Sequence, residues 1–296
     1  METYENAIEL NGVCKSYPNF RLEEVSFNVP KGCVMGFIGQ NGAGKTTTLR
    51  SILHTTNIDR GEIRIFGQDH IRNELEIKKR IAVVFDEIPF HGNLTAQDMN
   101  IIFSGIYPEW NSVTYYEYVK FFELPQKLKI SSYSKGMKMK LQIACALSHN
   151  AELLILDEPT AGLDPVVRDE VLQAFMRYME DGERSILMSS HITSDLDKIA
   201  DMVTFIDCGE IMLSERVDTL LDRHGLIKCA PDEFRVLDPE DVVDVRLNRF
   251  GAEVLVQDRV KAASAMPNAV IDRVNLEDIM VYYVDKRRKE RGLCIQ

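Results

Sequence analysis

The sequence has 296 residues, enough for about two domains of ordinary size or for one large domain with an appendage. With 45% hydrophobic and 27% charged residues, its composition is that of an ordinary globular protein, which excludes a disordered, collagen-like or disulfide-rich chain. The 46 acidic residues outnumber the 35 basic ones and give a formal net charge of -11, a sign that disfavours non-specific binding to nucleic acid.

The N-terminal segment and the cysteines indicate neither secretion nor a metal centre. The first residues, METYENAIEL, lack the basic and apolar regions of a signal peptide, and no apolar run approaches the roughly 18 residues that span a bilayer. No C-x-x-C pair occurs among the cysteines, which are Cys14, Cys33, Cys145, Cys208, Cys229 and Cys294. We expect a reduced, intracellular chain that reaches a membrane only through a partner.

Short β-rich apolar runs alternate with longer helical patterns up to about residue 210, which predicts an α/β fold with a largely parallel sheet. Buried strands are expected at 32–38, 81–85, 153–156 and 185–189. Between about 90 and 150 the pattern changes to three helices with no strand between them, at 96–106, 114–122 and 135–147. This segment is predicted to be a helical subdomain inserted in the α/β core.

The pattern changes again after about residue 225. Strand-like runs occupy 233–237, 241–247 and 252–257, and a turn at 248–251 separates the last two. A final helix has Asn275 as its N-cap, Glu277 and Asp278 in its first turn and basic residues near its end, which suits the helix dipole. We therefore divide the chain into a domain at 1–225 and a small α+β accessory region at 226–296.

A glycine-rich loop at residues 39–46, GQNGAGKT, matches G-x-x-x-x-G-K-[ST] between an apolar strand and a helical run. Its glycines let backbone N–H groups turn inward, and the helix N-terminus adds positive charge, so the loop suits a di- or triphosphate. Lys45 is expected to span the β- and γ-phosphates, Thr46 to bind Mg²⁺ and Thr47 to reach the α-phosphate. The expected binding residues are Gly39, Gln40, Asn41, Gly42, Ala43, Gly44, Lys45, Thr46 and Thr47.

A second acidic element, LLILDEPT at 153–160, is an apolar strand that ends in Asp157 and Glu158. Alone, such a pair is usually a solvated strand end. Beside a phosphate loop, Asp157 is expected to hold Mg²⁺ through its water shell. Glu158 is expected to polarise the water that attacks the γ-phosphate.

With four further motifs, residues 6 to about 225 resemble the nucleotide-binding subunit of an ATP-binding cassette (ABC) transporter. YSKGM at 133–137 resembles the signature LSGGQ, and AGLD at 161–164 follows the strand as the D-loop does. The resemblance implies that Ser134 and Gly136 contact the ATP of a partner subunit and that Asp164 lies at the dimer interface. It also implies that His191 touches the γ-phosphate and that Tyr17 stacks on adenine, although singly each has an ordinary structural explanation.

Two departures from the family pattern concern contacts to the nucleotide. Asp86 stands where the family has the Q-loop glutamine, and an acid there suits the Mg²⁺ shell because hard cations favour oxygen ligands. Lys135 and Met137 replace a glycine and a glutamine of the signature. Lys135 either adds charge beside a phosphate or is an exposed residue at a helix start.

The resemblance implies a P-loop NTPase fold and an ATPase that uses ATP and Mg²⁺. PTAGLDP at 159–165, the terminal LEDIMVYYV and the length resemble the ATPases of bacterial ABC-2-type exporters. These subunits energise export of a lipid, peptide antibiotic or drug through a separate permease. The implied partners are that permease and a second ATP-binding subunit, identical or different, with no nucleic acid. The implied location is the inner face of the cell membrane, with residues 86–94 and the helical subdomain receiving the permease.

Two alternatives remain open from the sequence. A non-transport ABC ATPase would act as a regulatory switch or nucleic-acid factor, with 226–296 as its sensor. The basic run KRRKER at 286–291 would then contact nucleic acid or anionic lipid, although such a run is more often a solvated helix end. A degenerate cassette that binds ATP without hydrolysing it is disfavoured because Glu158 and His191 are both present.

Overall fold

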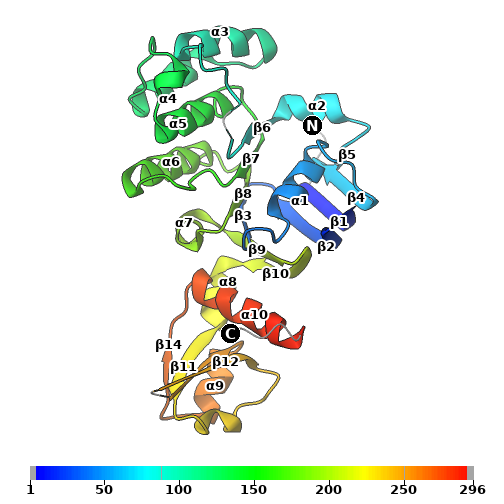
Figure 1. Ribbon diagram of the computed structural model, residues 1–296, viewed down its shortest axis with the longest axis vertical. Helices are drawn as coiled ribbons and strands as arrows, with labels where there is room; N and C mark the ends of the chain where they lie inside the picture. The colour runs from blue at the N-terminus through cyan, green and yellow to red at the C-terminus, as the bar shows by residue number, and fades with distance from the viewer. Residues whose placement is uncertain (1–4, 88, 250, 292–296) are drawn as a thin grey trace.

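The computed structural model describes residues 5–87, 89–249 and 251–291, which form three sheets with helices packed around them (Figure 1). Residues 1–4 and Cys294, which entered the expectations on a signal peptide and on cysteine pairing, lie outside the described residues. The five cysteines within the described part of the chain are all free thiols.

A six-stranded central sheet, in the order β10-β9-β3-β8-β7-β6, contains the predicted parallel strands. β3 is parallel to β8 and β9, and β7 is parallel to β6 and β8, whereas the edge strand β10 is antiparallel to β9. Their bounds are β3 Val34–Ile38, β6 Ile81–Val84, β7 Leu153–Asp157, β8 Ser185–Ser190, β9 Met202–Asp207 and β10 Glu210–Arg216. The four predicted buried strands are confirmed, with ends that differ by at most two residues.

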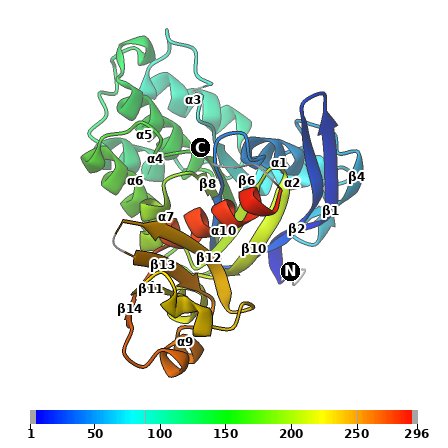
Figure 2. The ribbon, with the colours of Figure 1, turned by 60° about the horizontal axis from the view of Figure 1, so that its bottom comes forward.

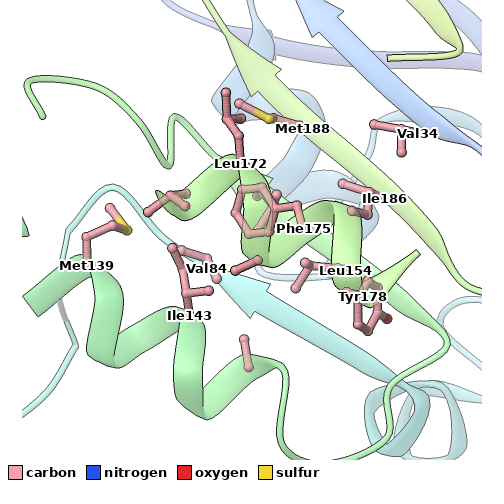
Figure 3. Packing of buried hydrophobic residues seen from close by; sticks show 14 of the residues in the cluster. Val34, Val84, Met139, Ile143, Leu154, Leu172, Phe175, Tyr178, Ile186 and Met188 are labelled. Carbon is pink, nitrogen blue, oxygen red and sulfur yellow. The ribbon is translucent and has the colours of Figure 1, made fainter. Parts of the chain in front are cut away.

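Both faces of the central sheet are buried, because successive side chains of a strand point to opposite faces. On β7, Leu154 and Leu156 belong to the larger hydrophobic cluster, whereas Leu153 and Ile155 belong to a second cluster. Figure 3 shows the larger cluster, in which Phe175 packs among strand residues. The sheet is therefore held between two packed layers.

A separate antiparallel sheet, in the order β2-β1-β4-β5, covers the face occupied by the second cluster. Its strands are β1 Asn6–Tyr17, β2 Phe20–Pro30, β4 Arg60–Ile65 and β5 Gln68–Asp69. Helices α1 (Lys45–Ile52) and α2 (Glu74–Arg80) contribute Leu49 and Ile77 to the same cluster. This sheet adds antiparallel strands to the largely parallel architecture expected from the sequence.

The helical subdomain extends from one side of the central sheet (Figure 1). Helices α3, α4 and α5 confirm the three predicted helices, with a short 3₁₀ turn η1 before α5. α3 begins with a capping box in which Thr95 and Asp98 bind each other's backbone N–H groups. The bounds of these and the next two helices are α3 Ala96–Ile106, α4 Ser112–Phe121, η1 Ile130–Ser132, α5 Lys135–Ala146, α6 Pro165–Tyr178 and α7 Thr193–Ile199.

The accessory region forms the third sheet, in the order β12-β13-β11-β14, with antiparallel pairing throughout. Its elements, with the helix that leads into it, are α8 Val217–Arg223, β11 Gly225–Cys229, η2 Glu233–Val236, β12 Val242–Asn248, β13 Gly251–Val256, α9 Arg259–Ala265, β14 Val270–Asp272 and α10 Leu276–Glu290. The predicted strands at 241–247 and 252–257 are confirmed as β12 and β13, which pair from Asn248 and Gly251.

The strand predicted at 233–237 is wrong, because Glu233–Val236 is the 3₁₀ turn η2. Glu233 accepts a hydrogen bond from the Ala230 N–H through its side chain at 2.8 Å, and its own N–H donates to the Ala230 carbonyl at 3.1 Å. These local bonds close a tight turn, which competes with an extended strand.

The last helix, α10, confirms the predicted N-cap, since Asn275 and Asp278 form a capping box. Its residues Leu276 and Ile279 belong to the larger hydrophobic cluster together with Leu196 of α7 and Phe205 of β9. The accessory region therefore shares a continuous core with the rest of the chain, and α10 crosses beside β10 (Figure 2). Within the described ranges, no helix combines the length and the apolar character that crossing a membrane requires.

Candidate functional site

The glycine-rich loop connects β3 to α1 and wraps around a buried lysine. Gly42 and Gly44 have φ values of 82° and 119°, where residues with a Cβ are strained. The side chain of Lys45 is 6% exposed, and its ammonium donates to the Gly39 carbonyl at 2.7 Å and lies 3.4 Å from the Gln40 carbonyl. The loop thus fixes a cation at the start of a helix, where an anion is also favoured by the helix dipole.

The acidic strand end of β7 lies next to this lysine. Lys45 Nζ is 3.1 Å from Glu158 Oε1, an oxygen that is buried and has no hydrogen-bond partner in the described chain. Glu158 has a φ of 51°, an uncommon conformation for a residue with a Cβ. The Lys45 ammonium is therefore a direct ionic partner of this carboxylate oxygen.

Ser189, at the end of β8, links the two acids. Its hydroxyl donates to Asp157 Oδ1 at 2.7 Å and accepts a hydrogen bond from the Glu158 N–H at 3.0 Å. His191 follows the same strand, and its Nδ1 and backbone N lie 2.7 and 3.3 Å from Glu158 Oε2. The structure therefore brings Lys45, Asp157, Glu158 and His191 together around one carboxylate pair.

A cavity of about 410 Å³ opens beside these residues and includes all three predicted metal ligands, Thr46, Asp86 and Asp157. The Thr46 hydroxyl lies 3.5 Å from Asp157 Oδ1. Among the described residues no group of three or more His, Cys, Asp or Glu side chains could hold a metal ion. The Thr46 hydroxyl and the carboxylates of Asp86 and Asp157 nevertheless suit Mg²⁺. This ion typically takes only a few oxygen ligands from the protein, and waters or phosphate oxygens complete its coordination.

The signature and D-loop residues cap helices. Ser134 is the N-cap of α5 and accepts from the Met137 N–H at 3.2 Å, and Asp164 is the N-cap of α6. Gly136 faces Val167, because a Cβ on it would lie 3.3 Å from that side chain. Neither Ser134 nor Gly136 nor Asp164 lines the cavity that contains Thr46 and Asp157. Within one chain these predicted site residues are not brought to the phosphate loop.

Tyr17 ends β1, and its side chain is 43% exposed, with the Lys15 ammonium 5.7 Å from its ring centroid. Phe20, in the same hairpin as Tyr17, packs against the phosphate loop. Its ring is so near Gly44 that a Cβ added to this glycine would lie 3.0 Å from it. The Tyr17 ring thus remains accessible on the hairpin that borders the loop.

Of the other predicted loop residues, Asn41 and Gly42 are exposed, Ala43 is buried and Thr47 is half-buried.

Three further residues belong to the site although no sequence motif predicts them. Ser189 holds both acids, and Arg50 lines the cavity beside Thr46. Gln142 of α5 is buried and exchanges two hydrogen bonds with the Phe85 backbone, at 3.1 and 2.9 Å, directly before Asp86. A glutamine among the apolar positions of a predicted helix was the only available signal for Gln142.

An apolar groove of about 320 Å³ lies between the central sheet and the helical subdomain. It is lined by Phe85, Phe90, Phe103, Tyr107 and His149, among others. The His149 ring stacks on Tyr107 with centroids 4.1 Å apart, and burial lowers the pKa of His149 to about 4. This histidine therefore stays neutral in the folded chain at neutral pH.

Replacing His149 by phenylalanine is expected to flatten the pH dependence of stability between pH 6.5 and 4.5. An unfolded histidine binds a proton below a pKa of about 6.5, whereas folded His149 does so only near pH 4, so acid favours the unfolded state. The free energy of unfolding should therefore fall by about 2 kcal/mol from pH 6.5 to pH 4.5. This pH-dependent decrease should disappear in the variant, in which phenylalanine keeps the stacking on Tyr107. Urea unfolding at both pH values measures the difference. Equal pH slopes in the two proteins would contradict the assigned state of His149.

Comparisons with known proteins agree with this geometry. The family described as "ABC transporter" matches residues 22–161. The bacitracin transport ATP-binding protein BcrA of Bacillus licheniformis is 36% identical over 69% of this chain and 67% of that protein. The lantibiotic transport ATP-binding protein SrtF of Streptococcus pyogenes is 33% identical over 71% of this chain and 91% of its own.

Solved structures give the same fold. An ATP-binding subunit of an ABC transporter superposes with a TM-score of 0.66 at 26% identity, covering 72% of this chain and 91% of that one. A dimeric ATP-binding cassette in a post-hydrolysis state superposes with a TM-score of 0.63 at 23% identity, covering 71% and 98%. The residues that match the family, 22–161, include the phosphate loop and the acidic strand end.

Proposed function

This chain belongs to the ABC transporter family of ATP-binding proteins, and on that premise we propose that it powers export of a peptide antibiotic, lipid or drug through a separate permease. It is an ATP-binding and ATP-hydrolysing subunit of an ABC transporter. The observation that carries the proposal is the convergence of Lys45, Asp157, Glu158 and His191 beside one phosphate-binding loop. Relatives whose names refer to bacitracin and lantibiotic transport support the substrate class.

In the proposed mechanism, the backbone N–H groups of the loop and Lys45 bind the phosphates. Glu158 accepts a proton from the attacking water, and His191 holds the same carboxylate in place. Mg²⁺, held by Thr46 and Asp157 with Asp86 at its water shell, would neutralise phosphate charge. Tyr17 would stack on adenine from the neighbouring hairpin.

We assign the signature residues to a second ATP-binding subunit's nucleotide. Ser134 and Gly136 lie at the start of α5 and outside the cavity of their own chain, so they are free to complete a site on a partner. Asp164 would lie at the same interface. The Lys135 ammonium lies against Gly162, within the D-loop, so its charge would also lie at this interface.

The permease is proposed to bind along the apolar groove and α3. Ile102 and Ile106, one helical turn apart, are 38% and 61% exposed and lie beside the groove residues Phe103 and Tyr107. Exposed aliphatic side chains next to an apolar groove are typical of an interface with another protein. Pro89 and Phe90, from the segment expected to receive the permease, line the same groove. This binding would hold the subunit at the inner face of the membrane.

Changing both Ile102 and Ile106 to aspartate is expected to weaken assembly with the permease at least about tenfold, because charges would enter an apolar interface. ATP hydrolysis by the free subunit should change less than twofold. The measurement is co-purification of the permease from solubilised membranes, together with ATPase rates. Val270→Asp, at an aliphatic position that is 67% exposed in the accessory region, is the matched control. Normal assembly of the double variant would show that the groove is not the docking surface.

The test of the proposed function is purification of the tagged full chain from membranes of its host, with identification of the proteins bound to it. A multi-span membrane protein that binds stoichiometrically and alters the ATPase rate supports the proposal. ATPase activity without such a partner, or with bound nucleic acid, favours the alternative of a non-transport ATPase. The ion pairs of Arg287, Lys289 and Arg291 with Glu210 and Asp244 count against that alternative, since they occupy much of the basic run.

A further inference from the structure

The C-terminal end of α10 lies against the phosphate loop, although the two segments are far apart in the sequence. Arg288 Nη2 donates a hydrogen bond to Gln40 Oε1 at 2.8 Å. A cavity of about 240 Å³ lies between them, lined by residues 40–43, by Asp207 and Cys208, and by three arginines at the end of α10. The accessory region thus borders the nucleotide-binding loop directly.

Two of these arginines fasten the end of α10 to the β9–β10 hairpin. Arg287 pairs with Glu210 and lies 4.0 Å from Asp207, and Arg291 pairs with Glu210 at 2.8 Å. The side chain of Arg287 is only 13% exposed, so its ion pairs are screened by salt less than fully exposed pairs are. The helix end is therefore held in a fixed position from which Arg288 reaches the loop.

The hairpin and Gln40 support the phosphate loop from both sides. The Gly209 N–H donates to the Ala43 carbonyl at 2.9 Å, which fixes the end of the loop nearer α1. The Gln40 carbonyl accepts from the Ala43 N–H at 3.1 Å and lies 3.4 Å from Lys45 Nζ. Gln40 is thus the residue at which a contact from α10 reaches the backbone around the catalytic lysine.

We propose that Arg288 is a positioning residue for the phosphate loop, which makes ATP affinity depend on the docking of α10. This inference rests on the proposed function only in that the loop binds ATP. Arg288 acts through Gln40 and has no contact with Lys45. By this connection, a displacement of the accessory region changes the loop geometry, and hence the affinity for the phosphates.

The test uses the full chain and titration with a fluorescent ATP analogue, together with steady-state ATPase kinetics. Arg288→Ala is expected to raise the dissociation constant and KM for ATP by about three- to tenfold, the range for the net loss of one ordinary hydrogen bond, because Arg288 acts on the loop only through Gln40. We expect kcat to change less than twofold. Arg288→Lys should recover part of the affinity, because lysine supplies a single donor over a similar reach.

Lys289→Ala is the matched control. Lys289 binds Asp244 at 2.7 Å and the Val245 carbonyl at 3.2 Å, so its loss perturbs α10 within the accessory region without touching the loop. Its ATP affinity should equal that of the unchanged protein. If Lys289→Ala and Arg288→Ala weaken binding and lower the melting temperature alike, Arg288 has a merely structural role.

A double-mutant cycle with Gln40→Ala separates positioning from independent effects. The Arg288→Ala, Gln40→Ala protein should bind ATP no more weakly than the worse single variant, because both changes remove the same hydrogen bond. Additive losses, or an unchanged affinity of Arg288→Ala, overturn the inference. An unchanged chain that failed to bind ATP would overturn the proposed function and this inference together.

Discussion

Replacing Glu158 by glutamine is expected to lower the rate of ATP hydrolysis at least about 100-fold, the range for loss of a general base. The amide cannot accept the proton of the attacking water, whereas its shape is nearly that of the carboxylate. ATP affinity should stay the same or rise. Glu158 Oε1 lies 3.1 Å from Lys45 Nζ and competes with phosphate for that cation. Phosphate release measures the rate, and titration of the same sample measures binding.

Glu117→Gln, at an exposed glutamate of α4, is the control for this substitution and should hydrolyse ATP normally. The comparison removes any general effect of losing one negative charge from an acidic chain. Hydrolysis by Glu158→Gln within threefold of the unchanged rate, with ATP binding intact, would falsify the assignment of Glu158. Another group in the cavity, such as Asp86 or Asp157, would then have to be the base.

Replacing Lys45 by alanine is expected to abolish binding as well as hydrolysis, with ATP affinity reduced by at least about 100-fold because a buried charge-assisted contact is lost. The buried ammonium is surrounded by the carbonyls of Gly39 and Gln40 and by Glu158. Its removal also leaves Glu158 without a counter-charge beside the phosphates. The two substitutions therefore have distinguishable results: Glu158→Gln separates binding from hydrolysis, and Lys45→Ala eliminates both.

The rise in melting temperature on addition of ATP measures the loss of ATP binding in Lys45→Ala, since a ligand stabilises a protein only as far as it binds the folded state. The unchanged chain should show a shift and Lys45→Ala none. Lys228→Ala, whose 56% exposed side chain pairs with Asp272 in the accessory region, should show the normal shift. A normal shift in Lys45→Ala would mean that the nucleotide binds elsewhere.

Motifs that are contiguous in the sequence were predicted well, because local chemistry determines them. The phosphate loop needs glycines at positive φ, and Gly42 and Gly44 have it. Buried parallel strands such as β7 appear as continuous apolar runs, since both of their faces are covered. For the same reason the helix start at Asn275 could be read from its capping residues.

Other features could not be predicted because they depend on contacts between distant segments. β1 has register shifts against both of its neighbours, so its buried positions do not follow a simple alternation. Gln142 binds the backbone of Phe85, and Arg288 binds Gln40, and neither pair shares a local motif. The turn at Glu233–Val236 was mistaken for a strand because short apolar runs do not distinguish the two.

The larger hydrophobic cluster, which contains Leu196 and Phe205 together with Leu276 and Ile279, bears on how this protein could have diverged from its relatives. A chain cut near residue 225 would expose that shared apolar surface to water and would tend to aggregate. The region beyond it is therefore not a detachable module. A recombination event that exchanged this region between two cassettes would yield a folded protein only if the matching surface of α7 and β9 were inherited with it.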